Sequence, residues 1–346
     1  MVVEKEKNFM DFIKLVSPGM PLRTVINDLI GAGLGAIIVF DSPELQTQSL
    51  FEGGFRINCR LTPQKLFELC KMDGGIIVSA DLSRILFANV LIVPDNTIHT
   101  NETGTRHKAA ERVAKQAKTF VIAVSERKRK TTLYYSNSKY YLKDTDELLR
   151  EISSSLQVLE KQREIFDAGL NNLNILEMSE LVSVGDVCKI VQRAEMILKI
   201  SETIKKNFTE LGKEGNIMQM RYRELVRNVE KIKTEILRDY SVLSLKKSVT
   251  VLANFTFDGL LDIESISRLI MEKPLEENIS PKGFRFLAHL PVSEKEISLI
   301  VRQFGNLKKI LEADSSEFEL IIKGRSGATK EEIVKLREQI LSGKII

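Results

Sequence analysis

The sequence predicts an α/β N-terminal domain with a mixed sheet, an all-α helical linker domain and a small C-terminal helix–hairpin–helix domain. Residues 1–145 alternate short β-branched runs with helical periods, whereas residues 146–289 repeat Leu, Ile and Val at three- and four-residue spacing. Residues 290–346 show short helical stretches separated by glycine-containing turns. The 346 residues suit two or three such units, because one domain takes roughly 150 residues.

Strands and helices alternate within the first domain. Strand-like runs bounded by Gly, Pro or Asp cover residues 36–40, 75–79, 85–93 and 119–124, and a hairpin is expected over residues 133–142. Thr62 and Pro63 mark the start of one helix, as N-cap and first helical residue. A second helix is predicted over residues 105–118, because small residues recur there on one face.

The helical region is predicted to be a bundle of long amphipathic helices. Apolar residues from Leu148 to Ile165 fit one helix face, and those from Val187 to Ile200 fit another. Gly212 and Gly215 separate the second helix from a third over Met218–Leu237. A bundle is favoured over a free coiled coil, because no apolar heptad runs cleanly for three or four repeats. Shorter helices are expected over residues 240–290.

Composition excludes several classes of protein. Lys and Arg number 51 against 47 Asp and Glu, so the net charge of +4 excludes a polycation that coats nucleic acid by bulk charge. The three cysteines, Cys59, Cys70 and Cys188, are too widely spaced for a disulfide framework or a zinc site, and reduced thiols are expected. No signal peptide and no apolar run of about 20 residues is present, so a soluble cytoplasmic protein is expected.

The segment Met72–Gly75 is the first candidate site, because a helix is predicted to end there and a strand to begin. Two glycines let the backbone adopt positive φ and let a ligand approach closely. Asp73 offers a carboxylate for Mg²⁺ or for the proton of a hydroxyl group. Taken alone, the same residues are also typical of a helix end followed by a tight turn.

The second candidate site is the start of the helix predicted from residue 105. A helix N-terminus attracts anions, and Thr103 or Thr105 is expected either to cap the helix or to bind phosphate. The next three residues, Arg106, His107 and Lys108, place cations where the helix dipole disfavours them, which predicts an anionic ligand. The alternative is a capped helix with solvated basic residues.

A basic run continues from this helix start. Residues 105–130 contain nine Arg or Lys and two Glu, a net charge of +7, which predicts contact with the phosphates of a nucleotide. Ser125 ends a strand just before Glu126, a position suited to a further phosphate contact. No P-loop, zinc-protease or nucleophile-elbow motif occurs, and Gly31–Gly35 precedes a strand rather than a helix, so a dinucleotide fingerprint is excluded. His99 and His289 lack partners and are interpreted as structural.

Two motifs resemble those of a known family. Asp73-Gly74-Gly75 resembles the Asp-Gly-Ala motif of diadenylate cyclase domains, and Gly104–Lys108 resembles their Arg-His-Arg motif. The resemblance continues in one order along nearly the whole chain, through Ser265–Arg268 and Gly283–Arg285 in the helical region, and is to the DNA-scanning branch of that family.

The resemblance implies an enzyme that condenses two ATP molecules into cyclic di-AMP and two pyrophosphates with Mg²⁺ or Mn²⁺. It implies that Asp73 binds the metal and helps to activate the ribose 3′-hydroxyl, with Arg106 and His107 as further catalytic residues. It also implies a homo-oligomer, an octamer with paired active sites. The residues expected to bind ATP are Gly74, Gly75, Ile92, Thr105, Arg106, His107, Lys108, Ala109 and Ser125.

The sequence departs from the family pattern at several places. Gly75 stands where Ala is usual and Lys108 where Arg is usual, and Glu126 either joins the metal shell or stays solvated. In the C-terminal domain, branched DNA is the expected partner, but the usual Gly-apolar-Gly hairpin is altered and the residues from Pro291 onward carry ten basic against nine acidic groups. The expected DNA-contacting residues are Gly305, Gly324, Arg325 and Gly327.

Two functional hypotheses follow from these observations. The first is an active diadenylate cyclase modulated by DNA bound to the C-terminal domain. The alternative is a DNA-junction-binding scaffold that binds ATP without turnover. An inert structural oligomer would not explain the basic cluster beside a glycine-rich turn.

Overall fold

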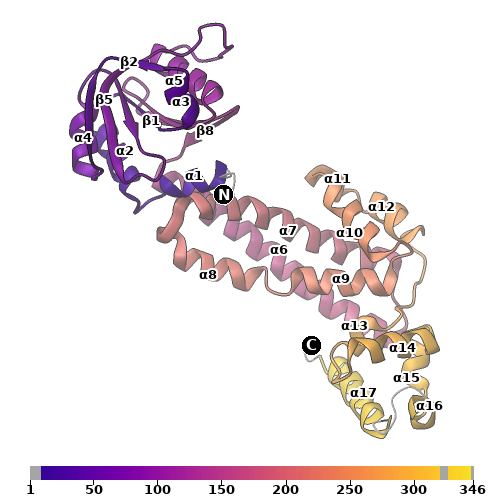
Figure 1. The fold of residues 1–346 in the computed structure, drawn as a ribbon. Coiled ribbons are helices and arrows are strands. Elements are labelled where there is room, and N and C mark those ends of the chain that lie inside the picture. Colours follow the sequence, from indigo (N-terminus) through magenta and orange to yellow (C-terminus); the bar gives the residue numbers. More distant parts are fainter. Residues whose placement is uncertain (1–8, 320–325, 344–346) are drawn as a thin grey trace. The chain divides into compact units, whose positions relative to one another are not determined.

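The computed structural model describes residues 9–319 and 326–343 (Figure 1). Its internal contacts divide the chain into two compact units. The sheet unit comprises Met1–Ser153 with Lys205–Gln219, and the helical unit comprises Ser154–Ile204 with Met220–Ile346.

The sheet unit is built on an eight-stranded sheet in the order β2-β5-β4-β1-β6-β7-β8, with β3 paired to β5. β1 and β4 are parallel, whereas the other described pairs are antiparallel, so the predicted mixed sheet is confirmed. The strands are β1 (Ala36–Phe40), β2 (Phe51–Glu52), β3 (Phe55–Arg60), β4 (Gly75–Val78), β5 (Arg84–Ile92), β6 (Phe120–Ser125), β7 (Lys130–Tyr135) and β8 (Ser138–Leu142).

Helices cover both faces of this sheet (Figure 1). Successive residues of a strand point to opposite faces, so Ile38 of β1 packs with Val25 and Leu29 of α2, whereas Ile37 packs with Val113 of α5. β1 is therefore buried along its whole length, which explains its continuous apolar run. The helices are α1 (Phe9–Leu15), α2 (Pro21–Gly31), α3 (Pro43–Thr47), α4 (Pro63–Cys70) and α5 (Thr105–Gln116).

The elements β1, β4, β5, β6, the β7–β8 hairpin, α4 and α5 were predicted from sequence to within a few residues. Thr62 caps α4 as expected, because its hydroxyl accepts from the N–H of Lys65 at 3.3 Å. The sequence patterns did not predict α1, α2, α3, β2 or β3. β3 is partly exposed and lies at the edge of the sheet, paired only with β5 among the described strands, so its apolar signal is weak.

Long helices follow the sheet, and two details of the prediction for them are wrong. The helix expected over Met218–Leu237 is two helices, because Asn228 adopts φ +62° between them. Ile165, expected on a buried face, is 39% exposed, and Phe166 is buried instead. The elements are α6 (Thr145–Ser179), α7 (Val184–Leu211), the 3₁₀ turn η1 (Gly212–Gly215), α8 (Asn216–Leu225) and α9 (Val229–Tyr240).

Shorter helices complete the helical unit, as predicted. The last four share one apolar core with α13, to which Ile300, Leu307 and Phe318 contribute. They are α10 (Leu245–Asn254), α11 (Phe257–Leu261), α12 (Ile263–Ile266), the π-helical turn η2 (Ser267–Met271), α13 (Phe284–Leu287), α14 (Glu294–Phe304), α15 (Leu307–Glu312), α16 (Ser315–Glu319) and α17 (Ser326–Leu341).

The glycines expected to contact DNA have different surroundings. Gly305 ends α14 with φ +79° and forms the turn into α15. Gly327 is the second residue of α17, so it lies in a helix rather than in a turn. Gly324 and Arg325 lie outside the described residues.

A buried polar network ties α13 to the long helices. The Asp239 carboxylate of α9 accepts from the N–H groups of Gly283 at 2.7 Å, Phe284 at 2.6 Å and Arg285 at 2.9 Å. The Arg285 guanidinium, only 5% exposed, donates to Glu177 and to Asn174, both on α6. Burial raises the pKa of the Asp239 carboxyl to about 7, and the nearby Glu177 carboxylate adds to the shift. Arg285 therefore compensates two buried acids.

Replacing Arg285 with Ala should destabilise the helical unit strongly. Glu177 and Asp239 would stay buried without their cation, which costs about 3–5 kcal/mol of the free energy of unfolding. Arg268→Ala is the matched control, because Arg268 pairs with Glu264 on the surface and such a pair contributes about 1 kcal/mol or less. Urea unfolding followed by circular dichroism measures both variants, and equal losses would contradict the assignment.

Candidate active site

The register of four strands brings the two predicted motifs to one edge of the sheet. Ile37 of β1 pairs with Gly75 of β4 in parallel, and Ala36 pairs with Val124 of β6 in antiparallel register. Gly75 also pairs with Val90, two residues before the end of β5. β1 and β4 therefore begin where β5 and β6 end, and this places Asp73, Ile92 and Ser125 at the same edge.

The turn at Asp73–Gly75 is shaped by close contacts with β5. Gly74 has φ +146°, and a Cβ atom there would lie 2.7 Å from Oδ1 of Asn89. A Cβ atom on Gly75 would lie 2.9 Å from Cδ1 of Ile92, so this glycine leaves room for the Ile92 side chain. Both glycines thus let β5 approach the turn closely.

The Asp73 carboxylate is exposed and has no hydrogen bond or ion pair with other residues in the described part of the chain. Among those residues no group of three or more His, Cys, Asp or Glu side chains forms a preassembled metal site. Asp73 is thus one free carboxylate beside a tight turn. Such a group suits a cation that takes its remaining ligands from substrate and water.

Helix α5 begins with an open N-terminus. Its N-cap is Gly104, whose side chain cannot cap, and no side chain accepts from the first turn. The alternative in which Thr103 or Thr105 caps the helix is therefore wrong. The first N–H groups of the helix are left for an anion.

Arg106 reaches across the sheet edge over a glycine that the sequence interpretation did not assign to the site. A Cβ atom on Gly35 would lie 2.1 Å from Nη1 of Arg106 and 3.2 Å from Cβ of Glu126. Only glycine at position 35 leaves this path open. The glycine-rich pattern Gly31–Gly35 is the feature of the sequence that could have indicated this contact, but it is tested above only against the dinucleotide fingerprint.

The other predicted residues of α5 differ in exposure. Thr105 is exposed, and Lys108 is partly buried with its N–H bonded to the carbonyl of Gly104 at 2.9 Å. The methyl group of Ala109 packs against the apolar core beneath α5. Any contact of Ala109 with a ligand would therefore come from its backbone.

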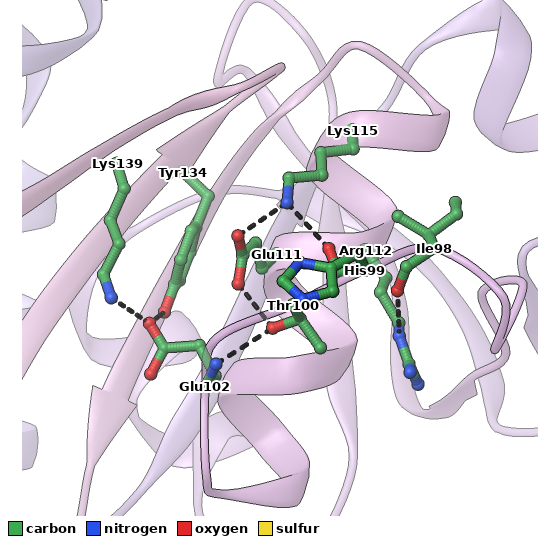
Figure 2. Close-up of polar contacts among 9 residues, drawn as sticks. All are labelled: Ile98, His99, Thr100, Glu102, Glu111, Arg112, Lys115, Tyr134 and Lys139. Carbon is green, nitrogen blue, oxygen red and sulfur yellow. Dashed lines mark hydrogen bonds and ion pairs between the residues drawn. The ribbon is translucent and has the colours of Figure 1, made fainter.

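His107 belongs to a polar chain that sequence reasoning did not find. Its Nδ1 lies 3.2 Å from the Tyr134 hydroxyl, which donates to Oε1 of Glu102 at 2.8 Å. Lys139 pairs with the same carboxylate (Figure 2). Burial lowers the pKa of His107, and the neighbouring Arg106, Lys128 and Lys139 charges lower it further, while Glu102 opposes the shift. His107 is thus held mostly neutral near pH 7.

Two cations of the basic run, Arg112 and Lys115, bind backbone carbonyls of the protein itself (Figure 2). Arg112 donates from Nε to the carbonyl of Ile98 at 2.9 Å, and Lys115 donates to the carbonyl of His99 at 2.9 Å and to Glu111 at 2.7 Å. These bonds fasten the loop before α5 to the helix. Lys118 follows the other end of this twelve-residue helix, about 18 Å from its start.

The turn after β6 carries the remaining part of the basic run. Ser125 is partly buried, and its hydroxyl accepts from the N–H of Lys128 at 3.2 Å, which orders the turn. Residues 126–130 are exposed. Because Arg112 and Lys115 are bonded to the loop before α5, fewer cations of the basic run are free than its net charge of +7 suggested.

Comparison with known proteins identifies the family. Residues 23–139 match the nucleotide-binding region of the DisA bacterial checkpoint controllers, and residues 142–274 match their linker region. The chain is 38% identical to the DNA integrity scanning protein DisA of Clostridium kluyveri, over 99% of both chains. Identity is 36% with the DisA of Clostridium botulinum strain Loch Maree, over 100% of both, and 38% with that of Carboxydothermus hydrogenoformans, over 97% of this chain and 98% of the relative.

The chain belongs to the DisA family. This confirms the resemblance seen in the Asp73 and Arg106 motifs. The DisA nucleotide-binding region spans Gly35, Asp73, Arg106, Ser125 and the other predicted ATP-binding residues, so they all lie in a nucleotide-binding domain. In the described part of the chain, no helix is long and apolar enough to cross a membrane.

Replacing Gly35 with Ala should weaken ATP binding by displacing the Arg106 guanidinium. Losing one charged hydrogen bond costs about 1.5–3 kcal/mol, or roughly 10- to 150-fold in Kd. Gly31→Ala is the matched control, because a Cβ atom there meets nothing within 4 Å. Calorimetric titration with ATP measures both variants. Unchanged affinity in Gly35→Ala would remove Arg106 from the site.

Proposed function

We propose that this protein is a diadenylate cyclase, a nucleotidyltransferase that condenses two ATP molecules into cyclic di-AMP and two pyrophosphates. The observation that carries the proposal is that Asp73 lies at the sheet edge to which Arg106, from the open N-terminus of α5, also reaches. An activating carboxylate and an anion cradle are the two parts that ribose attack on a phosphate needs. The DisA nucleotide-binding region over these residues supports the assignment.

In this proposal the start of α5 holds the phosphates of ATP. The free N–H groups after Gly104 and the Arg106 guanidinium offer donors to phosphate oxygens, and Lys108 adds charge. Because the Tyr134 hydroxyl donates to Glu102, it accepts from Nδ1–H of neutral His107, which fixes the ring and leaves Nε2 as a hydrogen-bond acceptor in the site. The Ser125 hydroxyl keeps its own hydrogen for a phosphate, because its bond to Lys128 uses the oxygen as acceptor.

In this proposal the adenosine part of ATP lies against the turn at Asp73–Gly75. Gly74 and Gly75 allow close approach to the backbone, and Ile92 offers an apolar contact for adenine. Asp73 is placed to accept the proton of the ribose 3′-hydroxyl or to hold the metal that activates it.

A divalent cation fits the residues present. Mg²⁺ and Mn²⁺ prefer oxygen ligands, and Mg²⁺ is usually held by one or two carboxylates plus substrate phosphates and water. Asp73 is such a carboxylate, exposed and without a protein partner in the described residues. When bound, the ion would neutralise developing charge on the phosphates.

The chemistry requires two chains. One α5 N-terminus and one Asp73 serve one ATP, and a cyclic product needs two 3′-hydroxyls and two α-phosphates in mutual reach. Apolar side chains exposed near this edge support a second copy facing it, namely Met72, Leu91 and Val93, exposed by 42%, 66% and 40%. We therefore propose a homo-oligomer, an octamer in which active sites are paired.

The C-terminal helices are proposed to be a helix–hairpin–helix domain that binds branched DNA and modulates the cyclase. α14 and α15 meet at Gly305, whose positive φ gives the tight turn that such a hairpin needs. The near-balance of charge after Pro291 indicates few phosphate contacts. The alternative function is a DNA-junction scaffold that binds ATP without turnover.

Replacing Asp73 with Asn should abolish cyclic di-AMP synthesis while ATP binding remains. Loss of a catalytic acid–base group typically lowers the rate by roughly 10²- to 10⁴-fold. Asp28→Asn, a change at another exposed carboxylate of the sheet unit, is the control and should leave the rate unchanged. Chromatography of products from ATP with Mn²⁺ measures both. An unchanged rate in Asp73→Asn would remove this residue from the mechanism.

Branched DNA should change the rate of cyclic di-AMP synthesis in a salt-dependent way. Phosphate contacts weaken as salt displaces them, so the effect should be present near about 50 mM salt and reduced near about 200 mM. Rates with and without a four-way junction, alongside a mobility-shift assay, measure this coupling. DNA retention without any ATP turnover would favour the scaffold, and bound DNA with an unchanged rate would reject the modulation.

A further inference from the structure

A cavity lies in the sheet unit, on the opposite face of the sheet from α5 and apart from the candidate active site. Its volume is about 190 Å³, and α2, the start of β7 and the segment after β8 line it. Thr131 points to the α2 side, since its strand neighbour Leu133 joins the α2 core and Tyr134 joins the α5 core. The sheet therefore separates this cavity from the Arg106 side of the molecule.

Two buried polar groups that line the cavity have incomplete hydrogen bonding. Arg23 is 3% exposed, and its Nη2 donates to the carbonyl of Lys143 at 2.8 Å, whereas Nε and Nη1 have no partner in the described structure. Thr131 is 1% exposed, and its hydroxyl likewise has no partner there. Leaving a buried donor unsatisfied costs about 1–3 kcal/mol, and more when it is charged. Nε and Nη1 of Arg23 and the hydroxyl of Thr131 are therefore hydrogen-bond donors that a bound acceptor would satisfy.

The charge around the cavity favours an anion. Arg23, Arg129, Lys130 and Lys143 line it together with the carboxylates of Asp144 and Glu147, and Glu210 and Glu214 also lie near Arg23, so the cations that can meet an anion are those at the rim. Lys143 is already paired with Glu151 at 2.6 Å. Arg129 and Lys130 are exposed at the rim and have no ion pair with other described residues. An incoming anion thus meets exposed, unpaired cations at the rim and buried donors beneath.

We propose that this cavity binds a small free oxyanion of the phosphate type, held by Arg23 and Thr131. The free N–H groups at Nε and Nη1 of Arg23 lie on different edges of the guanidinium, so each offers a single charged donor, and the Thr131 hydroxyl adds another donor. The volume corresponds to several water molecules, which suits inorganic phosphate or pyrophosphate but not a nucleoside triphosphate. Lys130 and Arg129 would attract the anion to the rim.

The test is calorimetric titration with inorganic phosphate at constant ionic strength. Thr131→Val keeps the shape of the side chain and removes the donor, so it should weaken this binding on the order of tenfold. Thr132→Val is the matched control, a buried threonine of the same strand that points to the α5 face, and it should bind phosphate at the cavity as the natural protein does. Lys130→Gln, at the exposed rim, should also weaken the binding without affecting the fold.

Arg106→Gln separates this site from the start of α5, because it removes a donor on the other face of the sheet. Phosphate binding that survives in Arg106→Gln and is weakened in Thr131→Val would support the proposal. Equal affinity in Thr131→Val and the natural protein would overturn it, leaving a cavity that holds only water. Loss of all phosphate binding in Arg106→Gln, or competition by AMP, would equally overturn the assignment to a separate site for a free oxyanion.

Discussion

The parallel pairing of β1 with β4 is the constraint on which the candidate active site depends. It sets the beginning of both strands at one edge of the sheet, and β6, antiparallel to β1, ends at the same place. Asp73 precedes β4 and Arg106 crosses the residue before β1, so the two residues lie at the same edge of the sheet although 33 positions separate them in the chain. A slip of one residue would exchange the β1 side chains of the α2 core with those of the α5 core, so both cores would have to repack.

Some cations of the sheet unit bond to other parts of the protein, whereas others are left unpaired. Arg112 and Lys115 fasten the loop before α5, and Lys139 pairs with Glu102, so these cations hold the helix start in place. Arg106 is left to face the open N-terminus, beside a histidine kept neutral by burial. A nearly neutral chain can thus present locally unpaired cations, because the few uncompensated groups are positioned by compensated ones.

In the helical unit, by contrast, buried charged groups are paired with one another and with backbone N–H groups. Asp239 satisfies three N–H groups at the start of α13, and Arg285 returns a cation to Glu177 on α6. Because a buried ion needs all of its partners, this network specifies one arrangement of α6, α9 and α13. α6 and α13 also contribute Met178, Phe286 and Leu287 to the C-terminal core, so the network is continuous with that core.

The sequence by itself determined the alternation of strands and helices, the start of α4 at Thr62 and the two motifs around Asp73 and Arg106, because local spacing and composition encode these features. Only the tertiary structure decided that Gly35 admits Arg106, that Tyr134 joins His107 to Glu102 and that Thr131 borders a cavity with Arg23. It also decided that α8 and α9 are separate helices, since the break rests on one backbone angle at Asn228. The reason is physical: a local pattern reports which face of an element is apolar, whereas a contact between distant residues exists only once the register of the sheet is set.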